Sequence, residues 1–173
     1  MLRTIRSLSA LAATAAIPAL ADQPQFERRT LPSGVTAIVQ TVPGARGVGI
    51  EAVYRVGFMD EPAGATQIAH LIEHIACRGG TASYEPDASF TMLAGLGSAN
   101  AETMPTLTHY DYILPTSALD QALAVEAERL SSLRIDEAII RQEAPRCYAE
   151  AAHLESAPQA PMLKFAMMAA NQV

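Results

Sequence analysis

The sequence predicts an α+β fold in which a mostly antiparallel sheet carries helices packed on one face. Two observations support this class. Short extended runs precede the first amphipathic segment, further short runs follow it, and two longer helical segments come after them. Half of the 173 residues are apolar but only 5% are aromatic, and much of the apolar fraction is alanine, which favours closely packed helices. The length suits one domain with its own core.

The extended elements begin with residues 26–31 and 35–40, which flank the turn Pro32-Ser33-Gly34 and therefore predict a β-hairpin. Residues 48–56 form a β-rich run after a Pro-Gly turn. Two more short strands are expected over residues 98–103 and 108–114.

The helices are predicted from their ends. Thr66 is a plausible N-cap for a helix over residues 67–77, which Gly79-Gly80 would stop, and a short helix is expected over residues 87–94. Later helices and breaks are expected at these positions: Ser117 as the cap of a helix to residue 133, Asp136 as the start of a helix to residue 154 that is interrupted or restarted at Pro145, and an apolar, Met-rich segment over residues 162–170.

The N-terminal residues 1–21 have the layout of a secretory signal peptide. They contain two arginines, no acidic residue, a short apolar run and the cleavage-type sequence Ala19-Leu20-Ala21. The apolar run of about a dozen residues is shorter than the roughly 20 that span a bilayer. We therefore expect a mature domain over residues 22–173, periplasmic or secreted, with no membrane span. A mitochondrial presequence is the alternative, because it is also arginine-containing and acid-free.

Charge limits the possible partners. Twelve Lys and Arg residues against 18 Asp and Glu residues give a formal net charge of −6. No basic stripe is available to neutralise phosphates, so nucleic acid is not an expected partner.

The segment His70-Leu71-Ile72-Glu73-His74 has the residue types and spacing of a metal-binding motif. On a helix, residues four apart share a face, so both imidazoles can reach one cation, and neutral imidazoles suit Zn²⁺. Glu73 lies on the same side, where a carboxylate can take a proton from water that a metal acidifies. The H-x-x-E-H spacing is the inverzincin signature. The alternative is a pair of surface histidines with a glutamate between them.

A third metal ligand is expected from a carboxylate on another helix. Glu150 is the candidate, and Glu143 lies two helical turns before it on the same face. Taken alone, each glutamate is more typical of a solvated helix position.

With this spacing, the chain resembles the pitrilysin–insulysin–mitochondrial processing peptidase family of zinc endopeptidases over about residues 26–158. The resemblance implies an N-terminal catalytic domain with one Zn²⁺ per chain, held by His70 and His74 on a zinc helix and by Glu150 on a second helix. It further implies that Glu73 is the general base and that Glu143 is an active-site carboxylate that supports the ligands.

The resemblance also implies a substrate and a partner. Residues 100–103 resemble the edge strand on which members bind an extended peptide, so Asn100, Ala101 and Thr103 are the candidate substrate-binding residues. Asn100 could equally mark only the start of a strand. Members pair two homologous halves around a chamber, so we expect a second homologous domain or subunit and a chain that is C-terminally incomplete. A non-catalytic, zinc-binding pseudo-enzyme subunit is the alternative.

Three features depart from the family pattern or stand close to the expected ligands. Gln67 stands where members usually carry glycine. A helix that restarted at Pro145 would keep Glu150 in place and displace Glu143. Cys77 and Cys147 each lie three residues from an expected ligand, and they could be buried apolar residues, a disulfide or a soft metal ligand.

Overall fold

The computed structural model describes residues 26–156 and residue 158, and the chain divides into two compact units after Gly44. The first unit contains the predicted hairpin: β1 (Phe26–Thr30) pairs antiparallel with β2 (Thr36–Gln40). Gly34 has φ +87° in the connecting turn, a conformation that glycine adopts without steric cost. The signal-peptide prediction and the apolar segment 162–170 lie outside the described residues.

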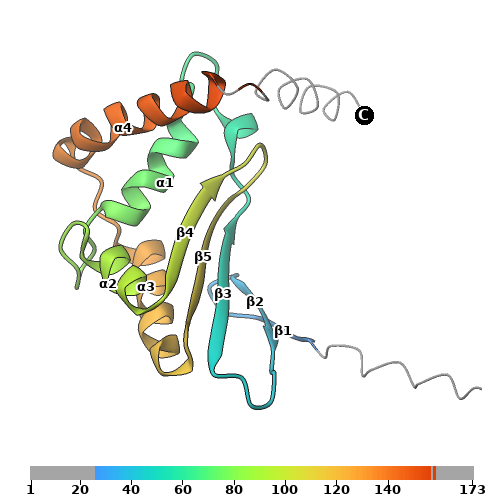
Figure 1. The fold of residues 1–173 in the computed structure, drawn as a ribbon. Helices are drawn as coiled ribbons and strands as arrows, with labels where there is room; N and C mark the ends of the chain where they lie inside the picture. The colour runs from blue at the N-terminus through green and yellow to red at the C-terminus, as the bar shows by residue number, and fades with distance from the viewer. Residues whose placement is uncertain (1–25, 157, 159–173) are drawn as a thin grey trace, which may run out of the picture. The chain divides into compact units, whose positions relative to one another are not determined.

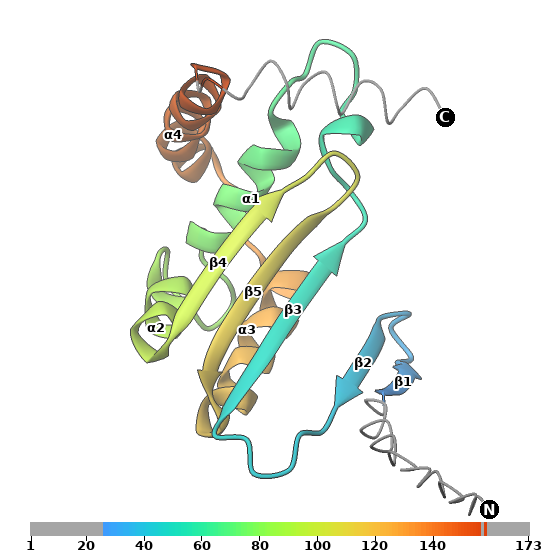
Figure 2. The same cartoon turned by 45° about the vertical axis from the view of Figure 1, so that its right-hand side comes forward.

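The second unit is built on a three-stranded antiparallel sheet with the order β3-β5-β4 (Figures 1 and 2). The strands are β3 (Gly47–Tyr54), β4 (Ser98–Thr103) and β5 (Thr108–Pro115). Side chains alternate between a buried and an exposed face along each strand. Tyr110, Tyr112 and Leu114 of β5 form the centre of the buried face. The expected α+β class is confirmed.

Helices cover the buried face of this sheet (Figure 2). They are α1 (Ile68–Arg78), α2 (Ala88–Leu96) and α3 (Leu119–Ser132), and α4 (Glu137–Ser156) packs against α1 (Figure 1). Short 3₁₀ turns, η1 (Phe58–Asp60) and η2 (Thr116–Ala118), precede α1 and α3. None of the described helices is both long and apolar enough to cross a membrane.

The caps of two helices differ from the prediction. Gln67, not Thr66, is the N-cap of α1, and Ala118 is the N-cap of α3 because Ser117 belongs to η2. Asp136 does start α4, since its Oδ1 accepts hydrogen bonds from the backbone N–H groups of Ala138 and Ile139 at 2.9 and 3.0 Å. The start of α1 depends on a contact from outside the local segment, which the sequence pattern does not show.

The predicted interruption at Pro145 is wrong, because α4 runs through it as one helix. Proline removes one helical hydrogen bond and crowds the carbonyl four residues earlier, at Arg141. Both Pro145 and Arg141 are exposed, so that carbonyl can turn towards water. The opposite side of α4 packs against α1 with Glu143 and Cys147 fully buried, and this packing holds the helix together.

Candidate metal centre

A glutamate from the preceding loop fixes the start of the helix that carries the H-x-x-E-H segment. Glu61 Oε2 accepts a hydrogen bond from Gln67 N at 3.0 Å, and its Oε1 accepts one from Ala69 N at 2.9 Å. These N–H groups have no partner inside the helix, and a carboxylate is also favourable at the positive end of the helix dipole. Nothing in the local sequence pattern pointed to Glu61, because it reaches α1 from outside the helix.

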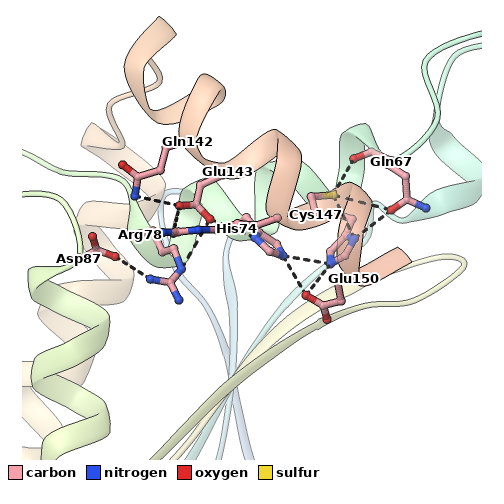
Figure 3. Close-up of polar contacts among 10 residues, drawn as sticks. Gln67, His74, Arg78, Asp87, Gln142, Glu143, Cys147 and Glu150 are labelled. Carbon is pink, nitrogen blue, oxygen red and sulfur yellow. Dashed lines mark hydrogen bonds and ion pairs between the residues drawn. The ribbon is translucent and has the colours of Figure 1, made fainter. Parts of the chain in front are cut away.

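His70 and His74 of α1 meet Glu150 of α4, as the sequence predicts (Figure 3). The two Nε2 atoms lie 3.2 Å apart. Glu150 Oε2 lies 3.4 Å from Nε2 of His74 and 3.9 Å from Nε2 of His70. His70 is buried, whereas the Glu150 side chain is 55% exposed, so the three ligand atoms meet at a site open to solvent.

Each imidazole is held from its other nitrogen. His70 Nδ1 lies 2.9 Å from Oε1 of Gln67, and His74 Nδ1 lies 3.2 Å from Oε2 of Glu143. Amide and carboxylate oxygens only accept hydrogen bonds, so both Nδ1 atoms carry the hydrogen and both Nε2 atoms present a lone pair. Two lone pairs and the Glu150 carboxylate therefore converge, and they repel one another unless a cation lies between them.

The spacing of the three atoms fits zinc. A tetrahedral ion with bonds of about 2.0–2.1 Å separates its ligand atoms by about 3.3–3.4 Å. The distances of 3.2 and 3.4 Å agree with that spacing. The longer distance from His70 to Glu150 involves the exposed side chain, which is free to adjust. Two imidazoles and a carboxylate are a common zinc donor set and also accept Mn²⁺ or Co²⁺.

Glu143 is a fully buried carboxylate whose charge is compensated. Its Oε2 lies 3.6 Å from Nε of Arg78, and its Oε1 accepts hydrogen bonds from Arg146 Nη1 at 2.6 Å and from Gln142 Nε2 at 3.1 Å (Figure 3). A buried carboxylate requires such partners to keep its charge. The sequence predicted the residue, but the tertiary contact with Arg78 was not foreseen.

Glu73 faces the sheet and is held there by β4. The Thr103 hydroxyl donates to Glu73 Oε2 at 2.6 Å, and both side chains are buried. Glu73 also lines an apolar cavity of about 280 Å³, to which neither histidine nor Glu150 contributes. The sequence suggested Thr103 as a substrate contact; the structure places its side chain against Glu73 instead.

The other predicted substrate residues lie on β4, at one edge of the sheet. Ala101 is half-buried against the core, and Asn100 is exposed on the opposite face. Within the described residues, β4 pairs only with β5. Its second edge therefore offers backbone hydrogen-bonding groups, which are the groups that bind an added strand.

Cys77 and Cys147 are both free and buried. Burial raises the pKa of Cys77 to about 12 and, with a contribution from the nearby charge of Glu150, that of Cys147 to about 11. Both thiols therefore resist deprotonation in the metal-free chain. Cys147 Sγ lies 3.2 Å from Nδ1 of His70, which places it beside the ring and away from Nε2.

An inverted H-x-x-E-H helix packed on an antiparallel sheet, with a glutamate from a second helix, defines a class of metallopeptidase-like domain. The family model described as insulinase (peptidase family M16) matches residues 37–173. The chain belongs to this family, as the sequence resemblance predicted.

Individual proteins are similar to this chain in sequence and in fold. The zinc protease PqqE of Helicobacter pylori (strain ATCC 700392 / 26695) is 27% identical over 115 residues, which cover 66% of this chain and 26% of that protein. A crystal structure of a protease from Helicobacter pylori superposes with a TM-score of 0.66 at 24% identity, covering 77% of this chain and 31% of the other. Pitrilysin superposes with a TM-score of 0.63 at 25% identity, covering 73% and 13%. The chain thus spans about a quarter of the curated relative's length, and the solved structures share its fold.

Proposed function

We propose that residues 22–173 are the N-terminal catalytic domain of a zinc metalloendopeptidase, which hydrolyses peptide bonds with Glu73 as the general base. The observation that carries the proposal is the convergence of His70 Nε2, His74 Nε2 and Glu150 Oε2 on one point. When bound there, zinc supplies a Lewis acid that polarises a peptide carbonyl and lowers the pKa of water.

The chain's own residues have separate tasks in this proposal. His70, His74 and Glu150 hold the ion. Glu143 orients the His74 ring through Nδ1 and makes its Nε2 more basic, as carboxylate partners of metal-bound histidines do.

Glu73 removes a proton from the attacking water molecule and passes it to the leaving amine. The hydroxyl of Thr103 donates to one carboxylate oxygen, Oε2, and no hydrogen bond of the described residues occupies Oε1. Thr103 therefore orients the carboxylate while Oε1 stays available for the proton.

The peptide substrate binds along the free edge of β4. Main-chain hydrogen bonds at Asn100 and Ala101 would hold an extended peptide with little dependence on its side chains. The position of Thr103 on the same strand links the peptide strand to the general base, because the residue next to the bound peptide also holds Glu73.

The variant Glu73→Gln tests the proposal. It keeps the size of the side chain and the contact with Thr103, but it cannot take a proton. We expect it to bind zinc like the parent and to lose hydrolysis of a quenched fluorescent peptide. The matched control is Glu137→Gln, an exposed change on α4 that should leave hydrolysis unchanged. Parent-level cleavage by Glu73→Gln would show that another group is the base.

The second candidate function is a non-catalytic, zinc-binding subunit that pairs with a second homologous chain. The observation that favours it is the position of Glu73, which is bonded to Thr103 and lines a cavity to which none of the three ligand residues contributes. Gel filtration combined with the peptide assay separates the two functions. Activity alone, or only with a second homologous chain, supports the enzyme, whereas inactivity in the reconstituted complex supports the pseudo-enzyme.

We also propose a periplasmic or secreted location, with a mitochondrial one as the alternative. The support is the cleavage-type sequence Ala19-Leu20-Ala21 in an acid-free N-terminal segment. N-terminal sequencing of the mature protein tests this: Asp22 as the first residue supports secretion, and an uncleaved or differently cleaved chain contradicts it.

A further inference from the structure

Gln67 has an unusual backbone conformation for its residue type. Its φ of 70° and ψ of 13° lie in the left-handed region, and only one other non-glycine residue of the described chain, Asp87, has a positive φ. Side chains other than glycine are disfavoured there by contact between Cβ and the backbone. Such conformations persist only when surrounding contacts impose them, and they gather at functional sites.

The surrounding contacts are present on the backbone of Gln67. Its N–H donates to Glu61 Oε2 at 3.0 Å, and its carbonyl oxygen accepts a hydrogen bond from Leu71 N at 2.9 Å. Glu61 Oε1 also accepts a hydrogen bond from Ala69 N, so one carboxylate binds both Gln67 and the first turn of α1. The left-handed conformation is thus fixed from the loop and from the helix together.

The side chain of Gln67 reaches forward along α1 to His70. Its Oε1 lies 2.9 Å from Nδ1 of His70, a side chain that is itself buried. Cys147 of α4 covers this pair, with Sγ 3.2 Å from the same Nδ1 and 3.9 Å from Oε1 of Gln67. The buried thiol therefore lies beside the amide, on the ring edge of His70 that carries Nδ1.

We propose that Gln67 is a positioning residue of the metal centre, which fixes the hydrogen of His70 on Nδ1 and turns Nε2 towards His74 and Glu150. It does for His70 what Glu143 does for His74, but with an uncharged amide from the same helix. It is not one of the three residues whose ligand atoms converge. Its effect on zinc rests on the proposed function, whereas its effect on the His70 tautomer does not require metal.

Three variants of the full chain separate the amide oxygen from the backbone. Gln67→Met keeps the length of the side chain without a strong acceptor. Gln67→Gly suits the left-handed conformation but also lacks the acceptor. Gln67→Glu keeps an acceptor oxygen at the same distance along the side chain. Circular dichroism and thermal melting of each variant establish that it is folded.

The first measurement is the ¹⁵N shift pattern of the histidine rings in metal-free protein, assigned by single histidine substitutions. We expect His70 of the parent and of Gln67→Glu to carry its hydrogen on Nδ1, and Gln67→Met and Gln67→Gly to lose this preference. The second is zinc affinity by competition with a chelator. Loss of the acceptor should weaken it by about tenfold or more, as removal of the hydrogen-bond partner of a metal-bound histidine does.

The outcomes distinguish this inference from the proposed function. If Gln67→Met and Gln67→Gly bind zinc as tightly as the parent and keep its His70 tautomer, the role of Gln67 is overturned and the proposed function is not. A parent chain that shows the Nδ1 tautomer but binds no zinc overturns the proposed function and leaves Gln67 as a residue that orients the ring. Weaker zinc binding by both variants, with recovery in Gln67→Glu, supports both.

Discussion

Glu143 Oε2 lies 3.2 Å from Nδ1 of His74, so a fully buried carboxylate of α4 orients one imidazole of α1. On the same helix, Glu150 presents its carboxylate to Nε2 of that ring. Two glutamates that lie two helical turns apart therefore face the two nitrogens of one histidine: Glu143 accepts the hydrogen of Nδ1, and Glu150 lies opposite the lone pair of Nε2. This arrangement joins α1 and α4 through the candidate metal centre.

Removing the Glu143 carboxylate should weaken metal binding. We expect Glu143→Ala to lower zinc affinity about 10- to 100-fold, because His74 loses the partner that orients it. Glu143→Gln keeps an acceptor oxygen without the charge and should fall between Glu143→Ala and the parent. Chelator competition measures the three affinities. Glu137→Ala, which breaks only the exposed pair with Arg141, is the control on the same helix and should bind zinc like the parent. Equal affinities for all four proteins would contradict the role of Glu143.

Removing the hydroxyl of Thr103 should impair the general base and leave the metal in place. In Thr103→Val the side chain keeps its shape but cannot donate to Glu73. We expect kcat for a peptide substrate to fall by about tenfold or more. Zinc content should not change, because Thr103 contacts none of the three ligands. Thr103→Ser, which retains the hydroxyl, should recover most of the rate. Full activity of the valine variant would show that Glu73 needs no such support.

Replacing Pro145 should stabilise the fold. Pro145 lies inside α4 on an exposed side, so Pro145→Ala restores a helical hydrogen bond without disturbing packing against α1. The expected gain in the free energy of unfolding is about 1–3 kcal/mol. Urea denaturation of the metal-free protein measures it. A less stable alanine variant would mean that the proline shapes α4 in a way that the packing on α1 requires.

The buried thiol of Cys77 should make stability depend on pH in the alkaline range. Its pKa is about 12 in the folded chain, and an exposed thiol in the unfolded chain has a pKa near 8.5. The folded state therefore holds this proton more tightly. Its contribution to stability is complete below the unfolded pKa, and it is lost as pH rises from about 9 towards 12.

Urea unfolding at several pH values, with Cys77→Ala as the comparison, checks this dependence. We expect the parent to lose more stability than the alanine variant between pH 8 and pH 10.5. The rate of alkylation of Cys77 in the folded chain should also stay low over this range, because the thiolate is the nucleophile. Parallel stability curves together with rapid alkylation near pH 9 would contradict the raised pKa.

The parts of the site that the sequence could predict are those set by helical spacing. His70 and His74 are four residues apart and share a face of α1, and Glu143 and Glu150 are seven apart and share a face of α4. The hairpin and the three strands followed from β-rich runs bounded by turn residues. These signals depend only on neighbours along the chain.

The parts that escaped prediction depend on contacts between distant segments. Glu61 caps α1 from a loop, so Thr66 was the wrong cap. The burial of Glu143 and Cys147 holds α4 together across Pro145, which local propensity alone would break. The contact between Thr103 and Glu73 joins β4 to α1 across 30 residues. The left-handed backbone at the start of α1 had one local signal. Gln67 stands where the family usually has glycine, the residue that adopts this conformation without steric cost.

The central claim is that His70, His74 and Glu150 form one metal site. The most direct test is elemental analysis of the chain purified without added metal, beside His70→Ala and Glu150→Ala. We predict about one zinc ion per parent chain and little metal in either variant, because two remaining ligands bind zinc far more weakly than three. A parent chain without bound metal, or variants that retain as much zinc as the parent, would contradict the account.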